Sequence, residues 1–336
     1  RSTEQTVDGQ WILEDPARRV LTANEISSSL LKVGDLLITK SSGSSLHIGK
    51  TTLVSDDIAS LGCCYSNFMQ RIRLDNNLKP RLVWFLLNNE VARLQFAFLS
   101  NSTTGLANLN GSMIGQVWVP IPPPSEQHAI AAFLDRETAK IDNLIAEQKR
   151  LVELLTEKRQ AVISHAVTKG LDPNAPIKDS GVEWLGEVPA HWSVLKFSRE
   201  VQIAEGQVQP DVEPYASMVL IAPNHVESGT GRLLLEETAA DQGAESGKYL
   251  CQQGEVVYSK IRPALAKATI ALRDCLCSAD MYPMCGRGKV VNTYLCKLLI
   301  SAPFTAWSVL EADRVAMPKI NRESLSNLRI PAPSLP

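Results

Sequence analysis

The loop from Gly43 to Thr51 is the part of this chain that most nearly matches a chemical motif, the phosphate-binding loop. That motif has four residues between its two glycines, whereas five residues separate Gly43 from Gly49. A phosphate cradle also needs backbone N–H groups that converge at the start of a helix. The residues that follow, Thr51 to Val54, are instead typical of a strand. We therefore do not expect this loop to bind a nucleotide.

The other residues that could support catalysis or bind a metal form no familiar constellation. The seven cysteines include no CxxC pair, so we interpret them as small buried hydrophobes in a reducing compartment. The sequence has no Asn/Asp-Pro-Pro-aromatic motif for adenine methylation and no glycine-rich turn for a methyl donor. We interpret His191 and Trp192 as packing residues. The prediction is a non-catalytic chain that holds no metal and no cofactor of its own.

The composition is that of a soluble globular protein with room for two domains: 336 residues, 44% apolar and 21% charged. No apolar run reaches the ~20 residues that a membrane span requires. The net charge of −2 argues against a nucleic-acid partner, because Lys and Arg neutralise phosphates. Between Gly254 and Arg329, however, eleven basic residues stand against six acidic ones, a net charge of about +5. A solvated face and a DNA-binding surface explain this segment equally well.

A long internal repeat organises the chain. Three segments recur in the same order at offsets of 220, 213 and 211 residues: Gly34–Lys40 with Gly254–Lys260, Arg81–Asn88 with Tyr294–Ser301, and Leu109–Pro122 with Ile320–Pro333. A period this long indicates two copies of one domain rather than a solenoid. We predict that residues 1–122 and 181–336 share one fold and are related by an approximate two-fold axis. Gly34–Lys40 and Gly254–Lys260 should then fall on the same strand.

Between the copies, the sequence predicts one continuous helix over residues 126–168. Ser125 suits an N-cap, no Gly or Pro interrupts residues 125–169, and Gly170 ends the run. The helix would be a rod of roughly 65 Å. Its apolar residues lie on one side, at Ile130, Leu134, Ile141, Leu144, Leu151, Leu155 and Val162. A small domain cannot bury so long a stripe, so we expect it to pack against an antiparallel partner helix not present in this sequence.

Two motifs carry a resemblance to a known family. Pro122-Pro123-Pro124-Ser125-Glu126-Gln127, with the helix that follows, is similar to the central helix of a type I restriction–modification specificity subunit. The segment from Gly181 to Trp192, which contains Glu183-Trp184-Leu185-Gly186, resembles the start of that family's target-recognition domains. The resemblance covers nearly the whole chain. It implies two target-recognition domains, each reading one half of a bipartite site in double-stranded DNA, and helices that space them.

The resemblance also implies partners and a cellular setting. The long helix would dock two methyltransferase (modification) subunits and, through them, the restriction subunits of a phage-defence complex. S-adenosylmethionine and ATP are expected on those partner subunits and not on this chain. The complex would be cytoplasmic.

These inferences give the α/β (α+β) fold class, with two similar target-recognition domains separated by long coiled-coil-forming helices. The expected parts are a first domain at 1–122, the long helix at 123–170, a linker at 171–180 and a second domain at 181–336. By the repeat, residue 1 corresponds to about residue 221, and the first copy lacks the opening motif. We therefore expect its N-terminal part, and a second long helix after residue 336, to be missing from this sequence.

The candidate DNA contacts lie in loops that differ between the copies. The first copy supplies Lys40, Ser42, Ser44, His47 and Lys50 in one loop, and Thr103, Thr104, Asn108 and Asn110 in another. The second copy supplies Lys260, Arg262 and Lys267, and then Arg314, Lys319, Asn321 and Arg322. Arg and Lys can reach guanine edges in the major groove or hold phosphates. For any single residue, exposure to solvent without a DNA contact remains an equal alternative.

One rival function is a scaffold whose long helix only assembles partner enzymes, and another is a nucleotide-dependent enzyme that uses the loop at 43–51. Divergence between otherwise matched loops favours the DNA reader, because a scaffold has no reason to vary them.

Overall fold

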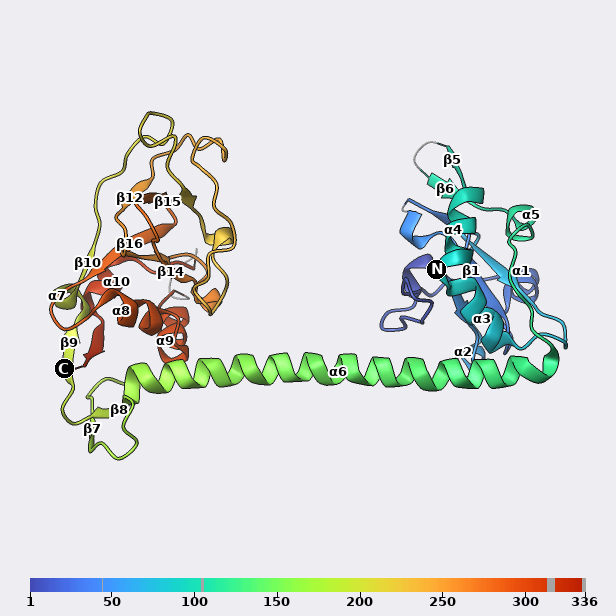
Figure 1. Cartoon of the computed structure of the whole chain (residues 1–336), viewed down its shortest axis with the longest axis horizontal. Helices are drawn as coiled ribbons and strands as arrows, with labels where there is room; N and C mark the ends of the chain where they lie inside the picture. The colour runs from blue at the N-terminus through green and yellow to red at the C-terminus, as the bar shows by residue number, and fades with distance from the viewer. Residues whose placement is uncertain (44, 104–105, 313–317, 334–336) are drawn as a thin grey trace. The chain divides into compact units, whose positions relative to one another are not determined.

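The computed structural model describes residues 1–43, 45–103, 106–312 and 318–333, and Figure 1 labels its helices and strands. The chain forms two compact units, residues 1–147 and 148–336. One helix, α6 (Pro124–Lys169), begins in the first unit and ends in the second. Both units mix helices with sheets, which confirms the predicted α/β (α+β) class with a long helix between two sheet-rich domains along the chain.

The first unit is built on an antiparallel sheet with the strand order β3-β1-β4. Its buried central strand, β1 (Leu36–Thr39), packs against helix α3 (Pro80–Asn88) and helix α4 (Glu90–Leu99) through Trp84 and Phe96. Apolar residues keep a helical spacing from Pro80 to Leu99. The structure divides this stretch at Asn89, whose side chain caps α4 by accepting the Ala92 N–H at 2.8 Å.

The remaining elements of the first unit are short. A second sheet has the order β2-β6-β5. The bounds are η1 (Ser2–Glu4), α1 (Ala23–Ser29), β2 (Ser41–Ser42), η2 (Ser45–His47), β3 (Thr51–Leu53), α2 (Asp56–Ser60), β4 (Met69–Ile72), β5 (Asn101–Thr103), β6 (Leu106–Asn108) and α5 (Gly111–Ile114).

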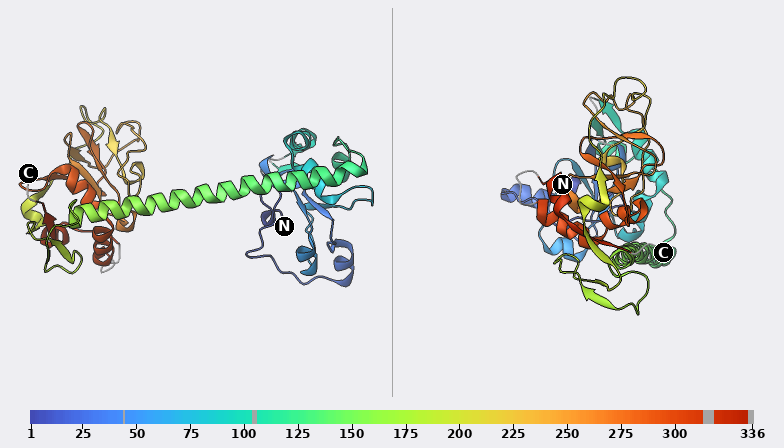
Figure 2. Two further views of the ribbon diagram at one scale, coloured as in Figure 1. Left: turned by 60° about the horizontal axis from the view of Figure 1, so that its bottom comes forward. Right: turned by 90° about the vertical axis from the view of Figure 1, so that its left-hand side faces the viewer.

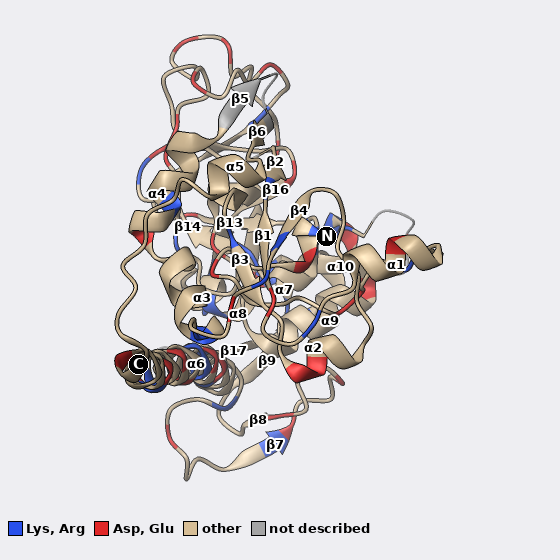
Figure 3. Ribbon diagram, turned by 90° about the vertical axis from the view of Figure 1, so that its right-hand side faces the viewer, with Lys and Arg blue, Asp and Glu red and all other residues tan. Residues whose placement is uncertain are grey.

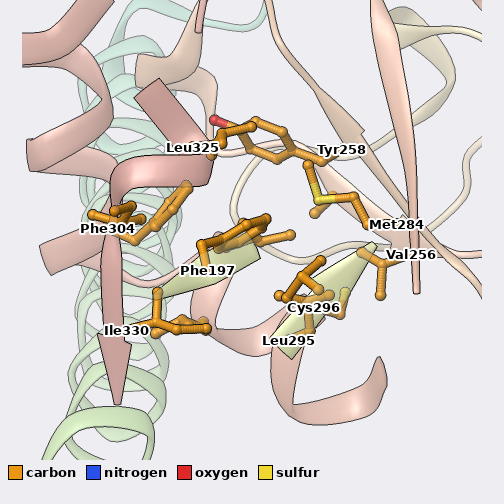
Figure 4. Packing of buried hydrophobic residues seen from close by; sticks show 14 of the residues in the cluster. Phe197, Val256, Tyr258, Met284, Leu295, Cys296, Phe304, Leu325 and Ile330 are labelled. Carbon is orange, nitrogen blue, oxygen red and sulfur yellow. The ribbon is translucent and has the colours of Figure 1, made fainter. Parts of the chain in front are cut away.

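The second unit is built on a four-stranded antiparallel sheet with the order β10-β16-β13-β14. Helices α8 (Asn292–Leu299) and α9 (Ala302–Ala312) pack against it, and their side chains meet those of the sheet in one core. Figure 4 shows the close packing in this core of Phe197, Tyr258, Phe304 and Leu325, each at most 1% exposed. The core therefore joins the sheet, the helices and the segment at Phe197, which follows the Gly181–Trp192 motif.

The described residues of the second unit also form smaller sheets in the orders β11-β15-β12, β17-β9 and β7-β8. The bounds of the remaining elements are β7 (Ile177–Asp179), β8 (Glu187–Pro189), β9 (Ser193–Lys196), α7 (Phe197–Glu200), β10 (Val201–Ile203), β11 (Leu220–Ile221), η3 (Pro223–His225), β12 (Tyr249–Cys251), β13 (Val256–Ser259), η4 (Pro263–Leu265), β14 (Ala268–Ile270), β15 (Cys275–Cys277), β16 (Met281–Gly286), α10 (Arg322–Asn327) and β17 (Arg329–Ala332).

The two units share one backbone framework, as the repeat predicted. The predicted pair of strands is β1 and β13, each the buried strand between two antiparallel neighbours. The glycines that precede them have φ angles of +84° and +86°. The Gly34 N–H donates to the Val54 carbonyl at 2.9 Å, and the Gly254 N–H donates to the Ala271 carbonyl at 2.8 Å. The predicted two-fold axis stays a prediction.

The shared framework extends to a hairpin that the sequence did not reveal. In the first unit Gln5 bridges to Trp11, and in the second Val226 bridges to Leu233. Gly9 and Gly231 turn these hairpins at φ +82° and +78°. A Cβ on either glycine would lie within 3 Å of a backbone carbonyl in the next strand, that of Thr51 or Ala268, so both positions require glycine.

Helix α6 confirms the predicted continuous helix and is 46 residues long. It runs without a break in the left-hand view of Figure 2. It begins at Pro124, one residue before the predicted N-cap, because proline suits the first turn of a helix. Gly170, at φ +80°, ends it. By length and composition no single helix of the described residues could span a membrane; only α8 and α9, taken together as a bent pair, pass that test.

Candidate nucleic-acid interface

In the second unit, cationic and aromatic side chains from four separate segments meet. The Lys260 Nζ lies 5.1 Å from the centroid of the Tyr282 ring, and the Arg322 guanidinium lies 5.0 Å from the same ring. Arg322 also lies 5.9 Å from the Tyr249 ring. Burial raises the pKa of Tyr282, while the charge of Arg322 acts to lower it. The sequence singled out Lys260 and Arg322 but not the two tyrosines.

Arg322 is also tied to its own unit. Its guanidinium donates to the Ile203 carbonyl at 3.3 Å and to the Ala204 carbonyl, and it lies 3.9 Å from the Glu205 carboxylate. These contacts hold the cation in place beside Tyr282. Arg322 is therefore a fixed positive charge at this surface rather than a freely mobile side chain.

Arg262 is the most accessible cation of the β13–β14 loop. It is exposed, and none of the described residues pairs with its guanidinium. Its backbone has a φ of +48°, although it is not glycine and it precedes Pro263. The left-handed region is unfavourable for such a residue and typically persists where a functional site holds it. The fold thus projects Arg262 at a local cost in backbone energy.

Lys50 and Lys267 were both predicted to contact DNA, but the structure ties both ammonium groups to backbone carbonyls of their own unit. Lys50 is 3% exposed, and its ammonium donates to the carbonyls of Ser2 and Gln5 at 2.6 and 2.7 Å. Burial, with the nearby charge of Arg93, lowers the pKa of Lys50. Lys267 is half-buried and donates to the Pro223 carbonyl at 2.7 Å. These equivalent lysines anchor the segment before each hairpin, so Lys50 is not a surface contact.

The first unit presents mainly hydroxyl and amide groups at the equivalent loop. Half-buried Ser41 donates from Oγ to exposed Asn108 at 2.6 Å. Lys40 is half-buried, and its backbone carbonyl accepts the Leu109 N–H at 2.7 Å. In the second unit the carbonyl of Lys260 accepts the Ile320 N–H in the same way at 2.9 Å. The framework that brings the two loops together is therefore common to both units.

The other predicted residues fall into four groups. Asn110 and Asn321 cap α5 and α10, accepting N–H groups at 3.0 and 2.7 Å, so their side-chain oxygens serve the fold. Ser42 and His47 are half-buried, and Lys319 is exposed at a bridge to Ile261. Thr103 ends strand β5. Ser44, Thr104 and Arg314 lie outside the described residues.

The loop at 43–51 does not have the geometry of a phosphate cradle. It contains the short 3-10 helix η2 and leads into strand β3, not into an α-helix. Among the described residues, no three His, Cys, Asp or Glu side chains group as metal ligands would. Cys296 is buried, and burial raises the pKa of its thiol, so it is a poor nucleophile.

Helix α6 leaves most of its apolar stripe exposed within each unit. Ile141, Leu144, Leu151, Leu155 and Val162 are between 46% and 59% exposed, whereas Ile130 and Leu134 are half-buried. Lys, Arg, Asp and Glu side chains lie along the same helix (Figure 3), in exposed pairs such as Lys140 with Glu137. Surface pairs of this kind contribute little stability. The exposed stripe suits a partner helix, and the antiparallel helix that the sequence predicts there stays a prediction.

Each end of α6 is fixed to its own unit. In the first unit, the Gln127 side chain accepts the Lys79 N–H at 2.9 Å, and Asp135 pairs with Arg81 at 2.6 Å. In the second unit, the Tyr294 hydroxyl donates to the Val167 carbonyl at 2.9 Å. The helix is thus an integral part of both units.

Comparisons with known proteins agree on one family. Residues 20–154 match the type I restriction modification DNA specificity domain. The chain is 34% identical over 238 residues to the type I restriction enzyme EcoDI specificity subunit of Escherichia coli, a match covering 66% of this chain and 53% of that protein. It is 26% identical over 261 residues to the MjaVIII specificity subunit of Methanocaldococcus jannaschii, covering 72% and 58%. The chain thus spans just over half the length of these relatives.

Solved structures show the same fold. A chain from a study of complex assembly and conformational transition of the type I R-M system has a TM-score of 0.67 at 15% identity, covering 99% of this chain and 78% of that one. The HsdS subunit from Thermoanaerobacter tengcongensis has a TM-score of 0.51 at 16% identity, covering 99% and 77%. At these identities the likeness concerns the fold alone. Together with the sequence matches, this likeness makes the chain similar, in sequence and in fold, to type I restriction–modification specificity subunits, with the DNA specificity domain of that system matched at residues 20–154.

Proposed function

We propose that this chain is a DNA sequence-specificity subunit in which each unit reads one half of a bipartite site in double-stranded DNA. The observation that carries the proposal is one backbone framework with unlike side chains at equivalent places. In the loops, Ser42 of the first unit corresponds to Arg262 of the second. In the sheets, Gln70 pairs with Ile38 in the first unit, and at the same place in the second unit Tyr282 pairs with Tyr258. A framework that keeps its hydrogen bonds but varies its exposed loops suits two readers of two different sequences.

The chemistry of the two loops supports different half-sites. In the second unit, Arg262 and Lys260 can donate to guanine O6 and N7 or to phosphates. In the first unit, Asn108 and the neighbouring hydroxyls can pair with adenine or hold the backbone. We propose these as the contacting groups, with Lys50 removed and Tyr249 and Tyr282 added as supports for the cations.

We further propose that the chain is non-catalytic and acts through partners. The exposed stripe of α6 docks methyltransferase subunits, and restriction subunits join the complex through them. S-adenosylmethionine and ATP then bind those partners, in the cytoplasm. The stripe by itself also favours the rival function, a scaffold that assembles enzymes without reading DNA.

Mapping methylated adenines in the source genome, with and without this gene, tests the proposal. A bipartite motif should lose its methylation when the gene is deleted and regain it on complementation. The scaffold is distinguished by variants of Arg262 and Asn108. If deletion abolishes methylation but neither variant changes the motif or its occupancy, the chain assembles the enzyme without reading DNA. If deletion changes no methylated site, the proposed function is wrong.

A further inference from the structure

In the second unit, the hairpin at residues 226–233 connects the long helix with the loop that carries Arg262. The bridge from Val226 to Leu233 closes the hairpin, and the Glu227 N–H donates to the Arg232 carbonyl at 2.8 Å. Its turn contacts α6 on one side and the η4 loop on the other. This segment belongs to no part of the predicted DNA surface.

On the helix side, two consecutive residues of α6 hold the turn. Arg159 donates from Nη1 to the Gly229 carbonyl at 2.8 Å and from Nη2 to the Thr230 carbonyl at 3.1 Å. Gln160 donates from Nε2 to the Gly229 carbonyl at 2.7 Å. Three side-chain bonds therefore converge on two adjacent carbonyls, and two of them carry the charge of the guanidinium.

On the loop side, the same turn holds η4. The Gly229 N–H donates to the Ala266 carbonyl at 3.1 Å, and the Ser228 hydroxyl donates to the Leu265 carbonyl. Ala266 has a φ of +43°, so η4 lies between two non-glycine residues in the left-handed region, Arg262 and Ala266. These bonds help to hold a turn that is intrinsically unfavourable for both residues.

Gly229 suits this turn through its backbone conformation, and a side chain there would displace Gln160. It has a φ of +67°, and a Cβ there would lie 2.7 Å from the Gln160 Nε2. In the described residues of the first unit, this connection is not repeated. The corresponding hairpin position, Val7, is 50% exposed, and no side chain of α6 donates to that hairpin among the described residues.

We propose that Arg159 and Gln160 are positioning residues for DNA recognition by the second unit. They fix the hairpin at 226–233, the hairpin fixes η4, and η4 presents Arg262. The inference rests on the proposed function. It assigns a role in reading one half-site to side chains of the spacer helix, which do not themselves touch DNA.

The test combines the double variant Arg159→Ala/Gln160→Ala with the single variant Gly229→Ala, in the full chain and its native complex. Methylated adenines are mapped in cells, and binding is measured on duplexes carrying the wild-type motif or changes in one half. Discrimination should fall about tenfold in the half-site that Arg262→Ala affects and should be unchanged in the other half. The salt dependence of binding should not change, because no phosphate contact is removed.

The matched control is Arg150→Ala/Lys158→Ala, which changes exposed cations elsewhere on α6 and should leave both halves intact. Arg159→Lys keeps the positive charge and a single donor nitrogen, so it should lose less discrimination than Arg159→Ala. Equal losses in both halves would indicate general destabilisation and overturn the inference, as would a motif unchanged in both test variants. If deletion of the wild-type gene changes no methylated site, the proposed function itself fails. If deletion of the gene removes methylation of a motif but the test variants leave that motif unchanged, the proposed function stands and only this inference is wrong.

Discussion

At the scale of single residues, the second unit's recognition is expected to depend on Arg262. Arg262→Ala should weaken binding by roughly 1–3 kcal/mol if the guanidinium contacts a base through two hydrogen bonds, and the loss should depend on one half of the site. A phosphate contact would instead weaken binding to all sequences and lower the salt slope by about one. Binding to DNA altered in each half, at two salt concentrations, separates these cases. Unchanged affinity for every duplex would remove this loop from the reading surface.

Asp35 provides a second residue-level prediction, on stability. It is 1% exposed and accepts two hydrogen bonds from Arg73 at 2.7 Å and the Lys32 N–H at 2.8 Å. Burial acts to raise its pKa, but the bonds from Arg73 and Lys32 hold the pKa below its ordinary value. Asp35→Ala should lower the free energy of unfolding of the first unit by about 2–3 kcal/mol, a value reduced because Arg73 is half-exposed.

The pH dependence of this loss follows from the sign of the shift. Because the folded pKa is depressed, the stabilisation is complete above the ordinary Asp value of 3.8 and is lost as the pH falls through the folded pKa. The difference between Asp35→Ala and the wild type in urea unfolding should therefore narrow in acid. Glu255→Ala, at the equivalent position of the second unit, is the control and should cost under about 1 kcal/mol. Equal losses at the two positions would contradict this account.

At the scale of elements, the exposed stripe of α6 predicts a docking face. Leu144→Asp/Leu151→Asp should abolish assembly with partner subunits, because each carboxylate would be buried unpaired against the partner. The isolated chain should lose little stability, about 0.5 kcal/mol or less, since both leucines are about half-exposed there. Asn143→Asp/Ala146→Asp, on the other side of the helix, adds the same charge and should assemble normally. If the leucine variant assembles as the wild type does, measured by size-exclusion chromatography, the stripe of α6 is not a docking face.

At the scale of the whole molecule, the two units are expected to act independently on DNA. Asn108→Ala should affect one half-site and Arg262→Ala the other, because each residue belongs to a different unit. Free-energy losses at separate sites add within about 0.5 kcal/mol, so the double variant should show the sum of the single losses. Titrations of all four proteins with one duplex measure this. A coupling above about 1 kcal/mol would mean that the units read DNA as one surface.

The sequence alone determined the repeat, the paired strands β1 and β13 and the continuous helix α6. It could do so because these features depend on local pattern: buried apolar runs, turn glycines and a long stretch without Gly or Pro. It also selected Arg262 and Lys260 as exposed or half-exposed cations, since charged loop residues usually remain at the surface.

Only the tertiary structure decided which polar residues serve the fold and which remain available to a ligand. Lys50 belongs to a polar loop of the sequence, yet its side chain is buried because its ammonium donates to the carbonyls of Ser2 and Gln5, about 45 residues away. The cluster of Lys260, Tyr282 and Arg322 and the bonds from Arg159 to Gly229 likewise join distant segments. A side chain's burial and partners depend on such long-range contacts, which no local pattern encodes.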